Sequence, residues 1–366
     1  MNERRKIRVA VVFGGRSTEH EVSCLGAGLI MGALDRDTYD VTGVGITRDG
    51  KWLRLPDDPS ALVATGGELP SVDALAARGG AAGVTLAGLA AVDVVLPLLH
   101  GPYGEDGTVQ GQLEMAGVRY VGAGVLASAV GMDKEYMKLV FAARGLPLGH
   151  YVVVRDRDWR QPPGPDAAAT ERKPVLDEIA ELGWPVFVKP ARGGSSIGTS
   201  RVREEAGIEA AVEAARCHDP KVLVEAEVPG IEIECAVLEG VAGGPPEASL
   251  PGQVLVGGGA DFYDFQAKYL TAETAMAIPP PIPDADIAEI RRLAGAAFDA
   301  VSCEGLARVD FFYTPRGEII VNEINTMPGM TPASGFPRMW EATGLPLPRL
   351  LDRIIATALA KPRGLR

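Results

Sequence analysis

The sequence predicts an α/β protein whose first domain is built on an open parallel sheet. One observation is the β-branched run at residues 8–15, which ends in two glycines and is followed by a stretch up to residue 34 that can form a helix. Another is the apolar run at residues 92–101, which also leads into a polar, glycine-rich loop. A third is the order strand, glycine loop, helix and strand across residues 184–227. Because ligands of open parallel sheets gather at the carboxyl ends of the strands, we expect functional residues in such loops.

The remaining elements follow from local patterns in chain order. Apolar or β-branched runs bounded by turn residues predict strands, and helical spacing that ends at glycine or proline predicts helices. The predicted strands lie near residues 39–46, 119–121, 150–154 and 231–238, with two more around 308–325, and the predicted helices lie at 108–116, 132–143, 204–217 and 285–300.

We expect three domains, an N-terminal domain at 1–125, a central domain at 126–228 and a C-terminal domain at 229–366. The glycine cluster at residues 122–124 predicts the first boundary, near residue 125. Residues 155–174 are rich in charge, proline and alanine, so we expect an exposed insertion with no catalytic part.

Composition limits the classes of partner. The chain of 366 residues carries 36 Lys and Arg against 48 Asp and Glu, and the formal charge of −12 disfavours nucleic acid and anionic lipid in the absence of a local basic run. No stretch is long and apolar enough for a membrane span or a signal peptide. The four cysteines form no CxxC pair, so we expect free thiols and a cytoplasmic location.

The most informative motif runs from Ala307 to Ser334. Alternation with period two places Arg308 and Asp310 on one face of a strand, and Glu323 and Asn325 on one face of the next, with a turn at 315–317 between them. Carboxylate and amide oxygens suit Mg²⁺ bridging ATP phosphates. The alternative is an amphipathic hairpin with a solvated polar face. It is disfavoured because the polar residues interrupt an apolar run.

A second motif, at residues 184–200, delivers Lys189 from a strand into a loop of glycines and serines. Backbone N–H groups in such a loop can cradle phosphate, and the lysine adds positive charge. The Walker A spacing is absent, and a bland flexible loop is the alternative. Lys134 would be a further phosphate contact, although a surface helix lysine is the default.

Three other residues have a functional and a structural interpretation. Glu225 and Glu232 would hold adenine and ribose edges, or would be solvated strand ends. His100 lies at a strand end beside a loop with two acidic residues, although a lone histidine is more often structural. The dinucleotide-binding fingerprint GxGxxG is absent.

Taken together, these segments resemble the ATP-grasp ligases, and within them the D-alanine:D-alanine ligase family. The resemblance covers roughly residues 8–352, outside the insertion at 155–174. Its most specific pieces, in order, are GGRSTEHEVS, HGPYGEDGTVQG, MDK, VKPARGGSSIG, DFYDFQAKYL and RVDFFYTPRGEIIVNEINTMPGMTPAS. It implies a Rossmann-like N-terminal domain and two α+β domains that clamp ATP.

The resemblance implies a nucleotide and metal site. ATP would lie between two domains, its charge offset by two Mg²⁺ ions, with Mn²⁺ as an alternative. The matching positions are Lys134, Lys189, Ser196 and Lys268 for the phosphates, Glu225 and Glu232 for adenine and ribose, and Asp310, Glu323 and Asn325 for the metals, with Glu323 bridging.

The resemblance also implies the ligation of two D-alanine molecules through D-alanyl phosphate, which supplies a peptidoglycan precursor, and a homodimer. Closure of a covering loop would keep water from the acyl phosphate. The matching positions are Glu19 for the first ammonium with His100 close by, Ser334 for the second carboxylate, Arg308 and the Gly329 N–H for the oxyanion, and Ser195 and Tyr269, with Glu19, for loop closure.

Two further hypotheses remain open. Relatives that use D-lactate carry Phe where this chain has Tyr269, so we favour an amine as the second nucleophile. A nucleotide sensor that keeps the fold without catalysis is disfavoured, because the four polar residues of the hairpin are all present. Phe265, Gly335 and the insertion depart from common family patterns, and Gly335 would alter the second subsite.

Overall fold

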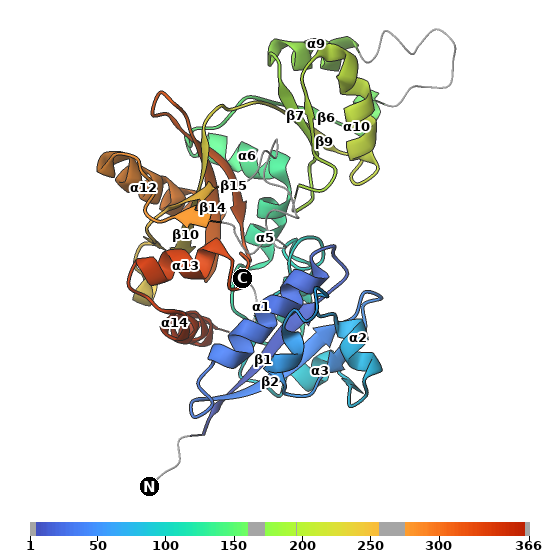
Figure 1. Cartoon of the computed structure of the whole chain (residues 1–366), viewed down its shortest axis with the longest axis vertical. Coiled ribbons are helices and arrows are strands. Elements are labelled where there is room, and N and C mark those ends of the chain that lie inside the picture. The colour runs from blue at the N-terminus through green and yellow to red at the C-terminus, as the bar shows by residue number, and fades with distance from the viewer. Residues whose placement is uncertain (1–4, 160–172, 195, 256–274, 363–366) are drawn as a thin grey trace.

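The computed structural model describes residues 5–159, 173–194, 196–255 and 275–362. It contains three sheets, arranged along the long axis of the molecule (Figure 1). The expected α/β class is confirmed. All four cysteines are free thiols, as expected. Within the described ranges, we find no helix with the length and apolar character that a bilayer crossing requires.

The N-terminal sheet has the strand order β4-β3-β2-β1-β5. β1 (Ile7–Gly14) lies between β2 (Tyr39–Ile46) and β5 (Val94–Pro97) and runs parallel to both, which explains its almost continuous apolar sequence. The sequence did not predict the antiparallel extension of this sheet by β3 (Trp52–Arg54) and β4 (Ala82–Gly83). The helical segments of this region are α1 (His20–Ala33), η1 (Pro59–Leu62), α2 (Val72–Ala77), α3 (Leu86–Leu89) and α4 (Thr108–Met115).

The second sheet is antiparallel throughout, with the order β13-β12-β10-β14-β15 and β11 beside β10. The predicted hairpin is confirmed: the Thr314 N–H donates to the Glu318 carbonyl at 2.9 Å, and Gly317 adopts φ 79° at the turn. The strands are β10 (Ile231–Leu238), β11 (Glu247–Ala248), β12 (Gly252–Leu255), β13 (Ala275–Ala277), β14 (Leu306–Tyr313) and β15 (Ile319–Asn325), accompanied by η3 (Val241–Gly243), α12 (Asp284–Ala300), α13 (Gly335–Ala342) and α14 (Leu347–Ala360).

The third sheet is small and lies at the end of the molecule opposite the N-terminal sheet (Figure 1). Its order is β6-β9-β7-β8, and every described pairing in it is antiparallel. The elements are β6 (Tyr151–Val154), α7 (Asp156–Trp159), α9 (Lys173–Glu181), β7 (Val186–Pro190), β8 (Ser200–Val202), η2 (Glu205–Gly207), α10 (Ile208–Arg216) and β9 (Val222–Ala226).

One expectation about this region is wrong at its start. The predicted exposed insertion begins at residue 155, but Trp159 is fully buried in the core of the small sheet. Its indole N–H donates to a Glu213 carboxylate oxygen at 2.6 Å, so the large ring is buried with its polar atom satisfied. Residues 160–172 lie outside the described part of the chain.

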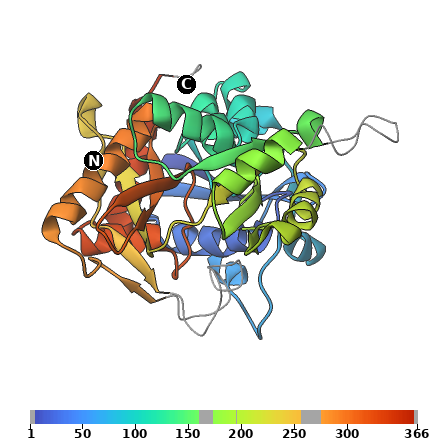
Figure 2. The same ribbon diagram turned by 90° about the horizontal axis from the view of Figure 1, so that it is seen from above.

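Two hydrophobic cores join segments that are distant in sequence. α14, near the C-terminus, packs into the core of the N-terminal sheet, where Ile354 and Ile355 are buried with Val9 and Val11. α5 (Val125–Met132) and α6 (Lys134–Ala143) contribute to the core of the second sheet, and both helices lie beside its strands (Figures 1 and 2). The division into domains at residues 125 and 228 stays a prediction.

The first prediction concerns this packing. Ile355→Ala removes buried carbon atoms where α14 meets the N-terminal sheet, so the free energy of unfolding should fall by about 2 to 5 kcal/mol. Chemical denaturation followed by circular dichroism measures the change. Met115→Ala is the control because Met115 is 92% exposed, and it should change stability by less than about 0.5 kcal/mol. Equal midpoints for the two variants would contradict the packing of α14.

Candidate active site

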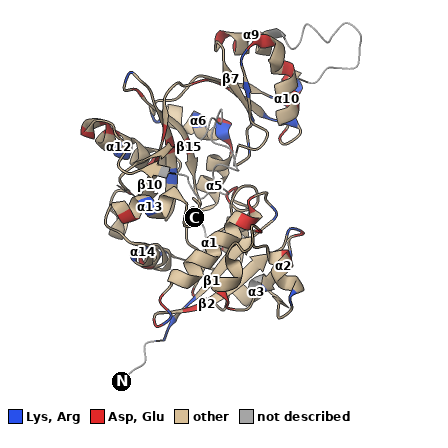
Figure 3. Ribbon diagram, in the orientation of Figure 1, with Lys and Arg blue, Asp and Glu red and all other residues tan. Residues whose placement is uncertain are grey.

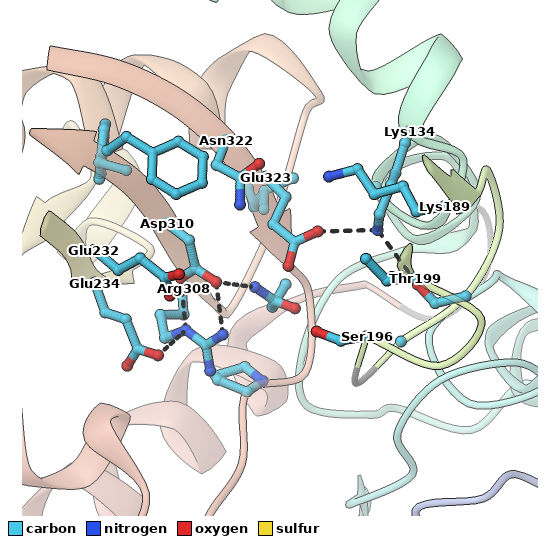
Figure 4. A pocket seen from close by; sticks show the side chains of 18 of the residues that line it. Lys134, Lys189, Ser196, Thr199, Glu232, Glu234, Arg308, Asp310, Asn322 and Glu323 are labelled. Atoms are coloured by element: carbon cyan, nitrogen blue, oxygen red, sulfur yellow. Dashed lines mark hydrogen bonds and ion pairs between the residues drawn. The ribbon is translucent and has the colours of Figure 1, made fainter. Parts of the chain in front are cut away.

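A cavity of about 370 Å³ is lined by residues from the regions that carry all three sheets. Figure 4 shows part of this lining from close by. Every predicted site residue that the structure describes lines the cavity, although the roles given to these residues stay predictions. Ser195, Lys268 and Tyr269 lie outside the described residues. The lining includes Glu19, His100, Lys134, Lys189, Ser196, Glu225, Glu232, Arg308, Asp310, Glu323, Asn325, Gly329 and Ser334.

The β14–β15 hairpin presents its polar side chains on the wall of this cavity. Asp310 is paired with Glu323 across the two strands, and Arg308 is paired with Asn325. After Asp310 the register shifts, because Phe311 is opposite Val321, which leaves Asn322 as an extra residue. The bulge therefore occurs beside the two carboxylates, and Asn322 also lines the cavity.

Asp310 is the centre of a hydrogen-bonded group (Figure 4). The Arg308 guanidinium donates from Nε and Nη2 to the two Asp310 carboxylate oxygens, each at 2.7 Å. The Asn325 amide donates to Asp310 Oδ2 at 2.9 Å. Arg308 Nε also lies 3.4 Å from Glu234 Oε1 on the adjacent strand β10. A bidentate pair of this kind fixes the guanidinium in one plane at the cavity wall.

Lysines from two different elements face the carboxylates. Lys134, at the start of α6, places its ammonium 2.9 Å from Glu323 Oε2 and donates to the Gly193 carbonyl at 3.3 Å. Glu225 is bound by Lys189 and also by Lys138, whose ammonium lies 2.9 Å from Glu225 Oε1. Burial alone would raise the pKa of Glu225, but the two lysines outweigh burial and lower it well below its ordinary value.

Lys138 was missed as a site residue in the sequence. Its signal was its position four residues after Lys134, which puts both lysines on one face of the helix. In Figure 3, Lys and Arg are spread among Asp and Glu over the described ribbon, with no continuous basic face in that view. The described lining of the cavity contains both signs of charge, with Lys134, Lys189 and Arg308 among a larger number of carboxylates.

Two residues of the N-terminal region hold the chain just after β15. Glu105 accepts from the Met327 N–H at 2.9 Å and from the Gly101 N–H at 2.8 Å. His100 Nδ1 lies 3.0 Å from the Met327 carbonyl. Because a carbonyl oxygen only accepts, His100 Nδ1 donates this hydrogen bond. Burial lowers the pKa of His100. Both backbone polar groups of Met327 are thus held by one loop.

Glu105 was noticed in the sequence only as an acidic residue of the loop, and no role was assigned to it. Burial, followed by the nearby negative charge of Glu19, raises the pKa of Glu105 to about 8. Glu19 also sets the shape of this corner. A Cβ on Gly194 would lie 2.9 Å from Glu19 Oε2, and one on Gly101 would lie 3.1 Å from it. Glycine at both positions lets two loops close around this carboxylate.

Ser334 lies immediately before α13. Its hydroxyl accepts from the Thr331 N–H at 2.9 Å and shares a hydrogen bond with the Thr331 hydroxyl at 2.8 Å. The side chain makes no hydrogen bond to the first turn of α13. The N-terminus of this helix therefore faces the cavity without a side-chain cap from Ser334, a geometry suited to an anionic group.

The donor set of the hairpin fits a hard divalent cation. Among the described residues, no three His, Cys, Asp or Glu side chains form a ready-made metal cage. Asp310 and Glu323 supply carboxylates, and Asn325 can supply its carbonyl oxygen by rotation of the amide. Mg²⁺ is commonly bound by one or two carboxylates together with substrate phosphates. Such a cation would have to replace Arg308 and Lys134 as partners of the carboxylates.

The chain is similar in sequence to known proteins over nearly its full length. The chain is 53% identical to a D-alanine–D-alanine ligase of Streptomyces griseus, with 99% of this chain and 95% of that protein covered. It is 53% identical to one of Kineococcus radiotolerans over the full length of both.

Solved structures show the same similarity. The D-alanine-D-alanine ligase of Coxiella burnetii matches with a TM-score of 0.80 at 36% identity, covering 97% of this chain and 94% of that chain. The VanG D-Ala:D-Ser ligase of Enterococcus faecalis matches with a TM-score of 0.81 at 31% identity, covering 97% and 100%. The family models for the D-ala D-ala ligase N-terminus and C-terminus match residues 8–123 and 140–356. The chain therefore belongs to the D-alanine–D-alanine ligase family.

Proposed function

We propose that this protein joins two D-alanine molecules to D-alanyl-D-alanine, with cleavage of ATP and release of ADP and phosphate, for peptidoglycan precursor synthesis. The observation that carries this proposal is the β14–β15 hairpin, whose polar residues face one cavity together with lysines of two other elements. Relatives named D-alanine–D-alanine ligase cover nearly the full length of the chain. ATP would convert the first carboxylate into D-alanyl phosphate, a better acyl donor.

The nucleotide occupies the side of the cavity nearest the small sheet. Lys134, Lys189, Ser196 and Lys268 bind its phosphates, and Glu225 and Glu232 contact adenine and ribose. Support for the phosphate contacts comes from the lysines, which already face carboxylates at short distance and can exchange them for phosphate oxygens. Lys138 keeps Glu225 paired during this exchange, because its ammonium lies 2.9 Å from the carboxylate.

Asp310, Glu323 and Asn325 hold the divalent cations, two Mg²⁺ ions with Mn²⁺ as an alternative. When bound, these ions offset the charge of the phosphates during transfer. Ser195 and Tyr269 act with Glu19 to close the covering loop, which excludes water from the acyl phosphate. Both residues lie outside the described part of the chain.

The amino acids occupy the side formed by the N-terminal loops and the start of α13. Glu19 binds the ammonium of the first D-alanine, and His100 lies close by. Ser334 binds the carboxylate of the second D-alanine, whose free amine attacks the acyl carbon. Arg308 and the Gly329 N–H donate to the oxyanion that this attack creates. The Met327 contacts support this arrangement, since they fix the backbone two residues before Gly329.

Three properties complete the proposal without bearing on the chemistry. The protein is expected to form a homodimer, which sedimentation analysis can test. Its location is expected to be the cytoplasm, where free thiols are stable. Neither nucleic acid nor a membrane surface is an expected partner.

The second prediction tests the function itself. Protein mixed with Mg-ATP and D-alanine should release phosphate only when D-alanine is present, and the dipeptide should appear in equal amount. Glu323→Gln should lower kcat by at least about a hundredfold, because the cation site loses a charged oxygen. ATP binding without dipeptide would favour the nucleotide sensor. Near-normal turnover of the variant would contradict the metal role.

The third prediction concerns the contact between Glu105 and Met327. At a pH above about 8, where Glu105 is a carboxylate, Glu105→Gln places an amide NH₂ opposite a backbone N–H. The loop that carries Gly329 should then loosen, and kcat should fall by about tenfold or more. The KM for ATP should change little. Asp106→Asn is the matched control, since Asp106 accepts only from Tyr103 and Thr108 of its own loop among the described contacts. Equal kcat values in both variants would refute the positioning role.

The fourth prediction concerns the acceptor. With an amine as the preferred nucleophile, D-alanine should outcompete D-lactate near neutral pH in a mixture of the two, as measured by mass spectrometry of the products. D-serine is offered as a third acceptor in the same assay, because the similar structure from Enterococcus faecalis is named a D-Ala:D-Ser ligase. Tyr269→Phe should keep ATP binding while slowing dipeptide formation. Preferential ester formation by the wild-type protein would contradict the interpretation of Tyr269.

A further inference from the structure

Glu234 is a buried carboxylate of the cavity wall to which the proposed function gives no role. It lies on β10, directly opposite Asp310 on β14, and the residue is only 8% exposed. Its Oε1 lies 3.4 Å from Arg308 Nε, within ion-pair distance. A carboxylate this deeply buried is costly unless cations or donors compensate it, so its position beside Arg308 calls for an explanation.

Gly335 provides the space that Glu234 uses. A Cβ built on Gly335 would lie 2.4 Å from Glu234 Oε2 and 2.6 Å from the Met276 terminal methyl. The carboxylate therefore fills the volume that a larger residue would occupy, and it reaches from Arg308 to the backbone at the start of α13. This gives a physical reason for glycine at the position beside Ser334.

Asp310 and Glu234, the two carboxylates beside Arg308, differ in that only Asp310 is proposed to bind a cation. Asp310 now binds the guanidinium with both of its oxygens at 2.7 Å. If Asp310 turns its oxygens to a divalent cation, this bidentate pair must open. Arg308, whose side chain is 16% exposed, would then be a partly buried cation that has lost one of its anionic partners. Glu234 is already within reach of the same Nε atom.

We propose that Glu234 is a positioning residue, which takes over Arg308 when Asp310 binds the cation and so keeps the guanidinium aimed at the reacting acyl group. This inference rests on the proposed function, because it assumes that Asp310 binds a cation and that Arg308 faces the oxyanion. Glu234 also favours cation binding, since Arg308 loses Asp310 but keeps an anionic partner within reach.

The test compares Glu234→Gln, which keeps shape and removes charge, with the wild-type protein. The first readout is the Kd of Mn²⁺ for the protein–ADP complex. It is measured by titration, with the concentration of free Mn²⁺ taken from its electron paramagnetic resonance signal. We expect a Kd about tenfold higher in the variant, the factor that corresponds to one lost hydrogen bond to a charged group. The second is kcat at saturating Mg²⁺, which should also fall about tenfold because Arg308 is no longer aimed.

Two further variants keep the inference falsifiable. Glu247→Gln removes a carboxylate from another glutamate–arginine pair, with Arg353 outside the cavity, and should leave both readouts unchanged. Gly335→Ala displaces the Glu234 carboxylate through the added Cβ and should raise the Mn²⁺ Kd in the same direction, which covers the case that Glu234→Gln does not fold.

The outcomes separate this inference from the proposed function. A Mn²⁺ Kd in Glu234→Gln within about twofold of the wild-type value would overturn the exchange of Arg308 between carboxylates. A lower kcat with an unchanged Kd would also overturn it, since a role only in substrate contact or packing leaves cation binding alone. Failure of the wild-type protein to make dipeptide would refute the proposed function instead, and the Mn²⁺ readout does not depend on turnover.

Discussion

The compensation of buried charge in the central cavity is the constraint on which the rest of this structure depends. Asp310 and Glu323 lie on the same wall of the cavity. Arg308 compensates the charge of Asp310, and Lys134 compensates that of Glu323. Glu225 is offset by lysines in the same way. Ion pairs of this kind add little net stability, because desolvation costs as much as the attraction returns. Their value here is that they keep a charged site assembled.

The same pairing explains how the site can accept a highly charged ligand. Mg-ATP brings anions and cations together, so phosphates can take the lysines while the divalent ions take the carboxylates. Each group then exchanges one partner of opposite charge for another, and no charge is left uncompensated. In this account Glu234 serves Arg308 in that exchange, as Lys138 serves Glu225. The cavity is therefore arranged for a change of partners.

Long-range contacts bring these charges together from distant parts of the chain. The loop that carries His100 and Glu105 leaves the N-terminal sheet and holds both polar groups of the Met327 backbone. Met327 follows the strand that carries Glu323 and Asn325, so this loop is tied directly to the end of the β14–β15 hairpin. α14 also connects the C-terminal part of the chain to the N-terminal sheet, because it packs into the core of that sheet.

The sequence predicted the parts of the site that depend on local structure. The hairpin was predictable because period-two alternation fixes which side chains share a face, and a glycine turn joins the strands. Glu105, Lys138 and Glu234 were not predicted, since their partners are distant in sequence. Trp159 was wrongly placed in an exposed insertion, because the residues around it are rich in charge and proline and only its own ring is apolar and large enough to be buried. The bulge at Asn322 had no local signal.

A crystal structure with ADP and Mg²⁺ tests the central claim most directly. The account predicts that Asp310 and Glu323 bind the cations, that Lys134 contacts a phosphate, and that Arg308 pairs with Glu234. Nucleotide and cation bound while the Arg308–Asp310 and Lys134–Glu323 pairs remain intact would contradict it.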